Sequence, residues 1–364
     1  MRDEIPWPPA WPRHLDAEFG PPPEGGYRAC ADDFEVEECL GFAPEGYGEH
    51  LWLWIEKRDA TTVMVARELA RLCEVGSRDI GYAGMKDRLA VTRQWFSVHL
   101  PGREAPQGLV EALAQRGIVA LSSQRHPRKL KRGVHRGNRF TLRLSGAAVD
   151  DDRLEQRWSR LIQQGVPNYF GPQRFGDGGR NLVRAREVLE KGWRKRDDRE
   201  GMLLSAARSY LFNAQLGERL ARGEWLEPLG GDVMMLDGTQ SLFAVETADS
   251  AVASRLAEGD IHPTAVLWGL GGSRAGAAAA ELEQAVLSRT PALCRGLERA
   301  GVKAARRALR VRLTQTHLRR EPGQAWVSFV LPSGAFATAV LRELMSHPSL
   351  EFRSTIATHD RGVS

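Results

Sequence analysis

The sequence has few cysteines, and none is placed for metal binding or redox chemistry. Its 364 residues include only Cys30, Cys39, Cys73 and Cys294, which form no CxxC pair and are accompanied by no His-rich cluster. A disulfide framework or a zinc site is therefore not expected. This cysteine usage suits a reducing compartment.

Long apolar runs are also missing. No stretch approaches the roughly 20 apolar residues that a membrane-spanning helix needs. The Pro-rich segment 1–26 contains no apolar core of the kind found in a secretory signal. We therefore expect a cytoplasmic protein that makes no membrane contact.

Several motifs of cofactor and metal chemistry are absent. The segment "GLGGSRAG" (269–276) has Arg274 where a dinucleotide-binding GxGxxG needs its last glycine, and no P-loop Lys-Ser/Thr follows. The sequence also lacks the HxE with PCxxC of zinc base deaminases, the GxSxG elbow of hydrolases and the HExxH of metalloproteases. Redox, ATP-dependent and zinc chemistry all lose support, and no metal ligand set is predicted.

Acidic residues are missing from one long basic segment. The chain has 51 Lys and Arg against 46 Asp and Glu, a net charge of only +5, yet residues 112–149 contain no acid. Seven cations lie within residues 125–140 of this segment: Arg125, Arg128, Lys129, Lys131, Arg132, Arg136 and Arg139. A solvated loop or a basic strand edge would be the simpler interpretation. We favour a contact with the phosphate backbone of a nucleic acid.

The segment "GYAGMKDRLAVTRQWFSV" (81–98) places Asp87 between a glycine turn and a strand. Gly81 and Gly84 allow backbone angles that bulkier residues avoid, and Val91–Val98 has the pattern of a half-buried strand. Asp87 is thus predicted on a loop fixed by rigid structure, where catalytic residues are common.

Hydrophobic periodicity predicts a mixture of strands and helices. Strands are predicted at 32–38, 50–57, 139–146 and 325–331, and helices at 61–73, 150–165, 202–220 and 335–345. In the strand at 32–38, Phe34 and Val36 lie on one face and the acids on the other, and Asp59 is a candidate cap for the helix at 61–73. The chain is long enough for two domains. The stretch between about 165 and 310 has a mostly helical pattern, so we expect a domain inserted into a sheet completed by both ends of the chain.

Several motifs in the same order resemble the tRNA pseudouridine synthase D (TruD) family over nearly the whole chain. They are "DDFEVEE", "GEHLWLWIEK", "YAGMKDRLAVTRQWFSV", "RGNRFTLRL", "GVPNYFGPQRFGDGGRNL", "LSAARSYLFN" and "LPSGAFATAVLREL". The resemblance implies an α/β (α+β) fold with a mixed sheet, V-shaped with a basic cleft. It assigns residues 1–164 and 311–364 to the catalytic domain and residues 165–310 to the inserted domain.

The resemblance also implies an activity and a set of site residues. The activity is the isomerisation of a uridine in tRNA, position 13 of the D arm, to pseudouridine, by a monomer without a cofactor or a protein partner. Asp87 matches the catalytic aspartate, which nearby cations are expected to keep ionised. Phe34, Asn138 and Phe336 match substrate-contacting residues, and Phe140, Arg28 and Lys86 are further candidates. Phe34, Phe140 and Phe336 each also fit a simple core position.

Two other functions stay open. A non-catalytic RNA-binding or RNA-chaperone protein could keep the fold, although an intact Asp87 argues against it. A carboxylate-dependent nuclease or glycosidase would need paired acids. The nearest acid in a motif is Asp177 of "RFGDGGRN", whose Asp-Gly dipeptide is typical of a turn.

Overall fold

The computed structural model describes residues 5–198 and 201–354, which divide into two compact units. The sheet unit consists of residues 24–152 and 313–334. The helical unit contains the described residues of the ranges 1–23, 153–312 and 335–364. Each unit thus combines segments that are far apart in the sequence.

The sheet unit is built on one mixed sheet with the strand order β14-β15-β7-β2-β5-β3-β6. The strands are β14 (Thr314–Glu321), β15 (Gln324–Pro332), β7 (Gly137–Ser145), β2 (Phe34–Cys39), β5 (Val91–His99), β3 (His50–Arg58) and β6 (Ile118–His126), with β1 (Gly26–Tyr27) beside β7 and β4 (Ile80–Tyr82) beside β5. Strands β2 and β5 run parallel, and the other pairs are antiparallel. The predicted fold class, α/β with a mixed sheet, is confirmed.

Burial alternates along β2 and β15, and in β2 one residue departs from the sequence prediction. In β2, Phe34 and Val36 are buried and the acids Glu35 and Glu37 are half-buried, as the alternation predicts. The exception is Glu38, which is buried on the same face as the apolar residues. The prediction that all acids of this strand lie on its polar face is therefore wrong. A buried carboxylate needs a partner of opposite charge or a hydrogen-bond donor, and Lys86 lies 3.2 Å from Glu38 Oε2.

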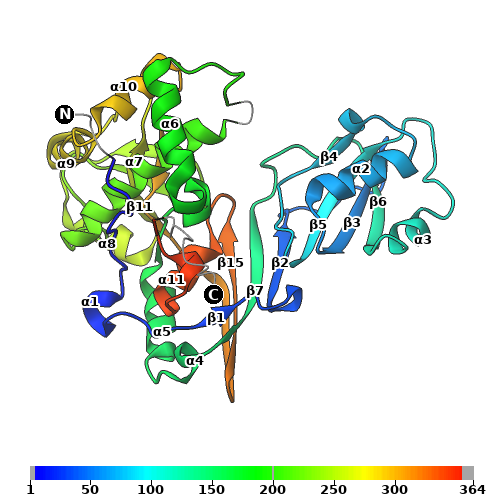
Figure 1. The fold of residues 1–364 in the computed structure, drawn as a ribbon, viewed down its shortest axis with the longest axis horizontal. Helices are drawn as coiled ribbons and strands as arrows, with labels where there is room; N and C mark the ends of the chain where they lie inside the picture. Colours follow the sequence, from blue (N-terminus) through cyan, green and yellow to red (C-terminus); the bar gives the residue numbers. More distant parts are fainter. Residues whose placement is uncertain (1–4, 199–200, 355–364) are drawn as a thin grey trace, which may run out of the picture. The chain divides into compact units, whose positions relative to one another are not determined.

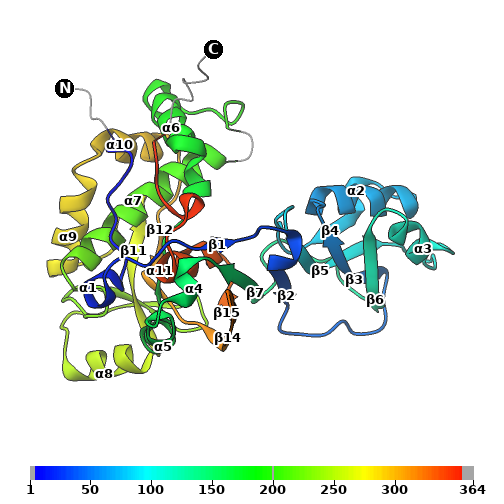
Figure 2. The same cartoon turned by 60° about the horizontal axis from the view of Figure 1, so that its bottom comes forward.

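One face of the sheet is covered by two helices, α2 (Thr62–Leu72) and α3 (Leu109–Ala114), shown in Figure 1 and Figure 2. Val65 and Leu69 of α2 pack with Leu53 and Phe96 of the sheet in one apolar core. The helix α2 begins after Thr61, whose side chain accepts a hydrogen bond from the backbone N–H of Met64. Thr61 is therefore the cap, and the prediction that placed Asp59 there is wrong.

The helical unit is arranged around one long buried helix, α7 (Met202–Ala221), with α6, α9 and α10 packed against it (Figure 2). The other helices are α1 (Asp16–Phe19), α4 (Ala147–Asp150, in the sheet unit), α5 (Leu154–Gln164), α6 (Arg180–Lys191), α8 (Ser250–Glu258), α9 (Ala277–Leu287), α10 (Pro291–Arg299) and α11 (Ala337–Leu344). Short 3-10 turns are η1 (Ala31–Asp33), η2 (Ser77–Asp79), η3 (Pro172–Phe175), η4 (Asp177–Gly179) and η5 (Pro348–Leu350).

The predicted helical stretch also contains strands. A four-stranded sheet has the order β10 (Leu242–Ala244), β9 (Val233–Leu236), β11 (Ile261–Leu267) and β12 (Ala305–Ala308), and β8 (Val166–Pro167) pairs with β13 (Arg310–Val311). These strands are short and lie between helices, so the helical periodicity around them dominated the sequence pattern. The V shape, the basic cleft and the boundaries of an inserted domain at 165–310 stay predictions.

Residues 5–23 of the Pro-rich segment pack against the core of the helical unit. The rings of Trp7 and Trp11 both pack against Phe175, and Arg342 donates a hydrogen bond to the carbonyl oxygen of Pro12 at 3.1 Å. The sequence pattern left the role of this segment open. Residues 5–23 therefore serve the fold of this unit.

All four cysteines are free thiols. Among residues 5–198 and 201–354, no helix is both long and apolar enough to cross a membrane. In the same residues, no group of three or more His, Cys, Asp or Glu side chains is arranged to hold a metal ion.

Candidate active site

Asp87 lies in the sheet unit on the loop between β4 and β5, with its carboxylate exposed to solvent. The side chain is 59% accessible, and its Oδ2 accepts a hydrogen bond from Nη2 of Arg28 at 2.8 Å. Arg28 follows β1 with a φ of 61°, in the left-handed region that few non-glycine residues occupy. Of the cations considered from the sequence, Arg28 is the one ion-paired with Asp87. The flanking Arg88 instead donates to the carbonyl oxygen of Asp59, at 3.2 Å.

The backbone of Asp87 is held by a buried lysine that the sequence analysis missed. Lys57 is only 1% exposed, and its Nζ donates to the carbonyl oxygens of Asp87 at 2.9 Å and Ala60 at 2.6 Å. Burial lowers the pKa of Lys57 to about 8, although the negative charge of Asp87 acts in the opposite direction. The carboxylate of Asp87 is thus accessible while its main chain is fixed.

Two buried polar side chains hold the same loop at other points. Thr62 Oγ1 accepts a hydrogen bond from the backbone N–H of Lys86 at 2.9 Å and donates to Gln94 Oε1 at 2.8 Å. Gln94 Nε2 in turn donates to the carbonyl oxygen of Gly84 at 3.1 Å. Together with Lys57, these contacts fix the backbone at Gly84, Lys86 and Asp87, so the loop is pre-organised.

Lys86 points into the sheet rather than toward solvent. Its Nζ donates to Asn138 Oδ1 at 2.8 Å and lies 3.2 Å from Glu38 Oε2. Burial raises the pKa of Glu38, and the ammonium of Lys86 partly offsets this rise. Burial, with the charge of Lys86, also lowers the pKa of His135 to about 4, so this imidazole is neutral near pH 7. Lys86 therefore connects the loop of Asp87 to the amide of Asn138.

The aromatic candidates of the sheet unit form a chain of ring contacts. The guanidinium of Arg28 lies 4.0 Å from the ring centroid of Phe34, and Phe34 and Phe140 meet edge to face at 6.2 Å. Both phenylalanines are buried, which suits a core role. The substrate contacts implied by the resemblance stay a prediction. Phe336 lies in the helical unit, 5.7 Å from the ring of Phe170.

Acids from elsewhere in the chain neutralise part of the basic segment. Arg125 Nη2 lies 3.3 Å from Glu104 Oε2, and Arg139 Nη1 lies 3.1 Å from Glu37 Oε1. The sequence window could not show these partners, because neither acid lies inside it. The cations that remain exposed are Arg128, Lys131, Arg132 and Arg136, whereas Lys129 is half-buried and donates to the carbonyl oxygen of Arg78. A role in RNA binding stays a prediction for all seven.

The alternation of buried and exposed positions along the strands could have predicted two buried charged residues that the sequence analysis missed. Glu38 follows Phe34 and Val36 at steps of two, and Lys57 likewise follows Leu53 and Ile55, so both charges fall on apolar faces. His135 carries no such signal, because its contact with Ser333 Oγ at 3.2 Å joins distant segments.

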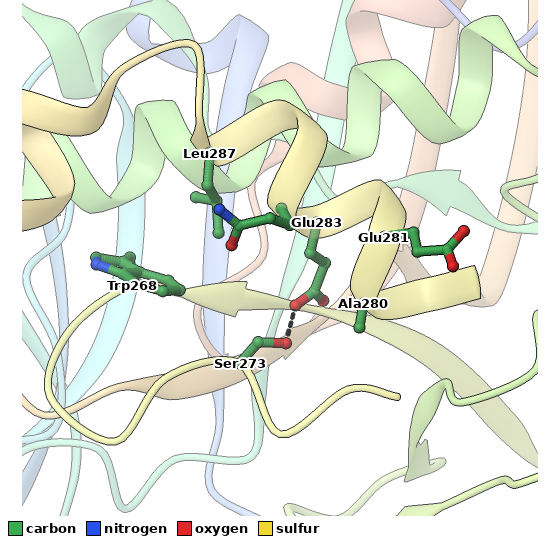
Figure 3. A pocket seen from close by; sticks show the side chains of 7 residues that line it. Trp268, Ser273, Ala280, Glu281, Glu283 and Leu287 are labelled. Carbon is green, nitrogen blue, oxygen red and sulfur yellow. Dashed lines mark hydrogen bonds between the residues drawn. The ribbon is translucent and has the colours of Figure 1, made fainter. Parts of the chain in front are cut away.

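A pocket in the helical unit is a different kind of site. It has a volume of about 630 Å³ and is lined by Trp268, Ser273 and residues of α9 (Figure 3). Figure 3 shows the hydroxyl of Ser273 directed at the carboxylate of Glu283. Glu283 Oε1 also pairs with the buried Arg306 at 2.5 Å. Because its one buried acid is already engaged, this pocket is best explained as a structural feature.

Fold and site together define an α/β protein with a mixed sheet and one exposed aspartate held among cations. The family model described as tRNA pseudouridine synthase D (TruD) matches residues 20–196 and 179–344. A protein of Chromohalobacter salexigens called tRNA pseudouridine synthase D is 56% identical over 345 residues, 94% of this chain and 98% of that one. One from Pseudomonas aeruginosa with the same name is 45% identical, over 88% of this chain and 90% of that one. The chain belongs to the tRNA pseudouridine synthase D (TruD) family.

The fold has a counterpart among solved structures. A protein of Methanosarcina mazei described as a tRNA pseudouridine synthase D (TruD) superposes with a TM-score of 0.67, covering 89% of this chain and 94% of that one. Its sequence identity of 21% is low, so this likeness bears on the fold alone.

Proposed function

We propose that this chain isomerises uridine at position 13 of the tRNA D arm to pseudouridine, with Asp87 as the catalytic carboxylate. The observation that carries the proposal is the combination of an exposed, ion-paired carboxylate with a backbone fixed by the buried Lys57. Family membership and the names of the relatives support the reaction and the tRNA substrate. A tRNA-modifying monomer of this kind would act in the cytoplasm.

The reaction rearranges bonds without any net oxidation or hydrolysis. The N1–C1′ bond breaks, the uracil turns, and C5 bonds to C1′; C5 loses a proton and N1 gains one. An ionised Asp87 can add to the sugar or the base, or stabilise positive charge at C1′. Because the Arg28 pair orients the carboxylate without burying it, all of these routes remain chemically available.

Asn138 is proposed to recognise the uracil edge. An ammonium group only donates hydrogen bonds, so the Lys86 contact fixes the Asn138 carbonyl oxygen inward and leaves its NH₂ group to donate. A uracil carbonyl oxygen is a suitable acceptor. The target base must leave its stack to reach Asp87, at a cost of a few kcal/mol. Phe34, Phe140 and Phe336 are proposed to stack on or confine the base, and the exposed cations from Arg128 to Arg136 to bind the backbone.

Exchange of the Asp87 carboxylate for an amide tests the proposal. With tRNA tritiated at uridine C5, each turnover releases tritium to water, because C5 loses its hydrogen. Asp87→Asn should release none while binding tRNA as before. Asp59→Asn is the matched control: it removes another exposed carboxylate next to the same loop, and turnover should persist. A tRNA with cytidine at position 13, tritiated at its remaining uridines, should release no tritium.

The outcomes separate the candidate functions. Turnover by Asp87→Asn would rule out the catalytic role of Asp87. A wild-type chain that binds tRNA but releases no tritium would favour the non-catalytic RNA-binding function.

A further inference from the structure

Arg174 lies against two aromatic rings in the helical unit. It belongs to η3, and its guanidinium carbon is 5.6 Å from the ring centroid of Phe170 and 5.8 Å from that of Phe336. The side chain is half-buried. A guanidinium on an aromatic face keeps its N–H groups at the edge of the ring, where they can bind a ligand.

The hydrogen-bonding capacity of Arg174 is mostly unused. Within residues 5–198 and 201–354, its guanidinium donates only to Ser205 Oγ, at 3.1 Å, and forms no ion pair with an acid. Several buried arginines of the same unit have more partners: Arg306 pairs with Glu283 at 2.5 Å, Arg219 pairs with Asp232 at 2.8 Å, and Arg310 donates to His262 Nδ1 and to the carbonyl oxygens of Leu256 and Ile261. A guanidinium has five N–H donors. Arg174 therefore differs from these arginines in how few of its N–H groups have an acceptor within the described part of the chain.

A second cation lies close to Arg174. The guanidinium carbon of Arg307 is 4.2 Å from the same Phe170 ring. Burial, together with the positive charge of Arg174 as a smaller cause, lowers the pKa of Arg307 to about 9. Two partly desolvated like charges repel each other, and an anion between them would relieve that repulsion.

The start of α11 adds further donors beside Phe336. Phe336 is the N-cap residue, and no side chain caps the first turn of the eight-residue helix. The N-terminus of a helix carries unsatisfied N–H groups and a partial positive charge. In the first turn, Thr338 Oγ1 is buried and has no hydrogen-bond partner in the described part of the chain. This corner of the helical unit thus combines a guanidinium, an uncapped helix start and a hydroxyl without a partner.

We propose that Arg174, Phe336 and the start of α11 form a binding site for a phosphate group of the RNA backbone. The site rests on the proposed function, because it assigns a contact for the same tRNA substrate. Arg174 would donate charge-assisted hydrogen bonds to the phosphate, and Phe336 would contact the adjoining nucleotide.

The test measures tRNA affinity as a function of salt, in the full-length Asp87→Asn chain so that the RNA is not converted. Losing one phosphate contact should weaken binding by Arg174→Gln about tenfold. It should also reduce the slope of log Kd against log salt by about 0.7–0.9. Arg174→Lys keeps the charge and should retain most of the slope. The matched control is Arg180→Gln, which removes an exposed, ion-paired arginine from the next helix and should change neither quantity.

The proposal fails if Arg174→Gln, folded by circular dichroism, binds tRNA with the wild-type affinity and slope. If Arg174→Gln does not fold, the Arg174→Lys variant decides the question. The site is supported if this variant binds tRNA at least threefold more weakly than the Asp87→Asn parent with the same slope of log Kd against log salt. An unchanged affinity overturns the site. Tritium release by the chain with Asp87 intact is measured in parallel. Release together with a negative Arg174 result sinks only the phosphate site, whereas absence of tRNA binding and of release sinks both proposals.

Discussion

Replacing Lys57 by methionine tests two effects of its buried ammonium group. One is on the pH dependence of the free energy of unfolding, and the other is on the position of the Asp87 backbone. Methionine keeps the apolar stem of the side chain but cannot donate to the carbonyl oxygens of Asp87 and Ala60. The folded chain has a pKa of about 8 at Lys57, against 10.5 for an unperturbed lysine. This difference corresponds to about 3 kcal/mol in favour of the neutral amine.

The sign of the pH dependence follows from proton counting. Below pH 8 Lys57 is protonated in both the folded and the unfolded chain, so it contributes no slope. Between pH 8 and 10.5 the unfolded chain keeps a proton that the folded chain has lost, so stability rises with pH. The free energy of unfolding of the wild type, minus that of Lys57→Met, should therefore grow by about 2 kcal/mol between pH 7 and 9.5.

Urea unfolding at a series of pH values measures this difference. The contributions of titratable groups that both chains share cancel in it. Lys131→Met, which removes an exposed lysine, controls for the loss of a positive charge. At pH 7, Lys57→Met should also release tritium at least tenfold more slowly, because the Asp87 backbone loses its tether and small misplacements are costly. If the free energy of unfolding varies with pH in the same way for the wild type and Lys57→Met, the argument from the burial of Lys57 is refuted. If Lys57→Met releases tritium at the wild-type rate, Lys57 does not need to hold the Asp87 backbone for turnover.

Two further substitutions test the surroundings of Asp87. Arg28→Ala should lower the free energy of unfolding by only about 1 kcal/mol, because the partner carboxylate of Asp87 is 59% accessible and the ion pair is therefore weak. The same variant should slow tritium release at least tenfold, and an unchanged rate would show that the pair does not orient the carboxylate. Gly137→Ala should lower the free energy of unfolding by about 1–3 kcal/mol or more, because the new Cβ would lie 2.3 Å from the carbonyl oxygen of Leu331. A wild-type urea midpoint would show that β7 and β15 can separate at little cost.

Local patterns in the sequence were sufficient to predict five strands, β2, β3, β5, β7 and β15, and the loop that carries Asp87. The alternation in β2 and β3 reflects burial of one strand face, a property that neighbouring residues share. The same alternation places Glu38 and Lys57 on apolar faces, so a stricter application of the pattern would have predicted both buried charges.

Contacts between distant segments could not be predicted in this way. Arg28 and Asp87 are 59 positions apart, and His135 and Ser333 are 198 apart. Each pair depends on which strands become neighbours, and periodicity within one strand carries no information on that order. The stacking of Arg174 on Phe336 likewise joins a 3-10 turn to the start of a distant helix.

The placement of the cations around Asp87 follows from their different burial. A carboxylate that meets a substrate must be accessible, and an accessible side chain on a loop is normally mobile. Here the buried Lys57 holds the main chain of Asp87, and Lys86, also buried, extends to Asn138. Among residues 5–198 and 201–354, Arg28 is the one that contacts the carboxylate itself. The adjacent cations Lys86 and Arg88 thus bond to Asn138 and to the backbone of Asp59, while Arg28, which contacts the carboxylate, comes from the segment after β1. An incoming substrate can compete with one exposed ion pair without disturbing the buried contacts that keep the loop in place.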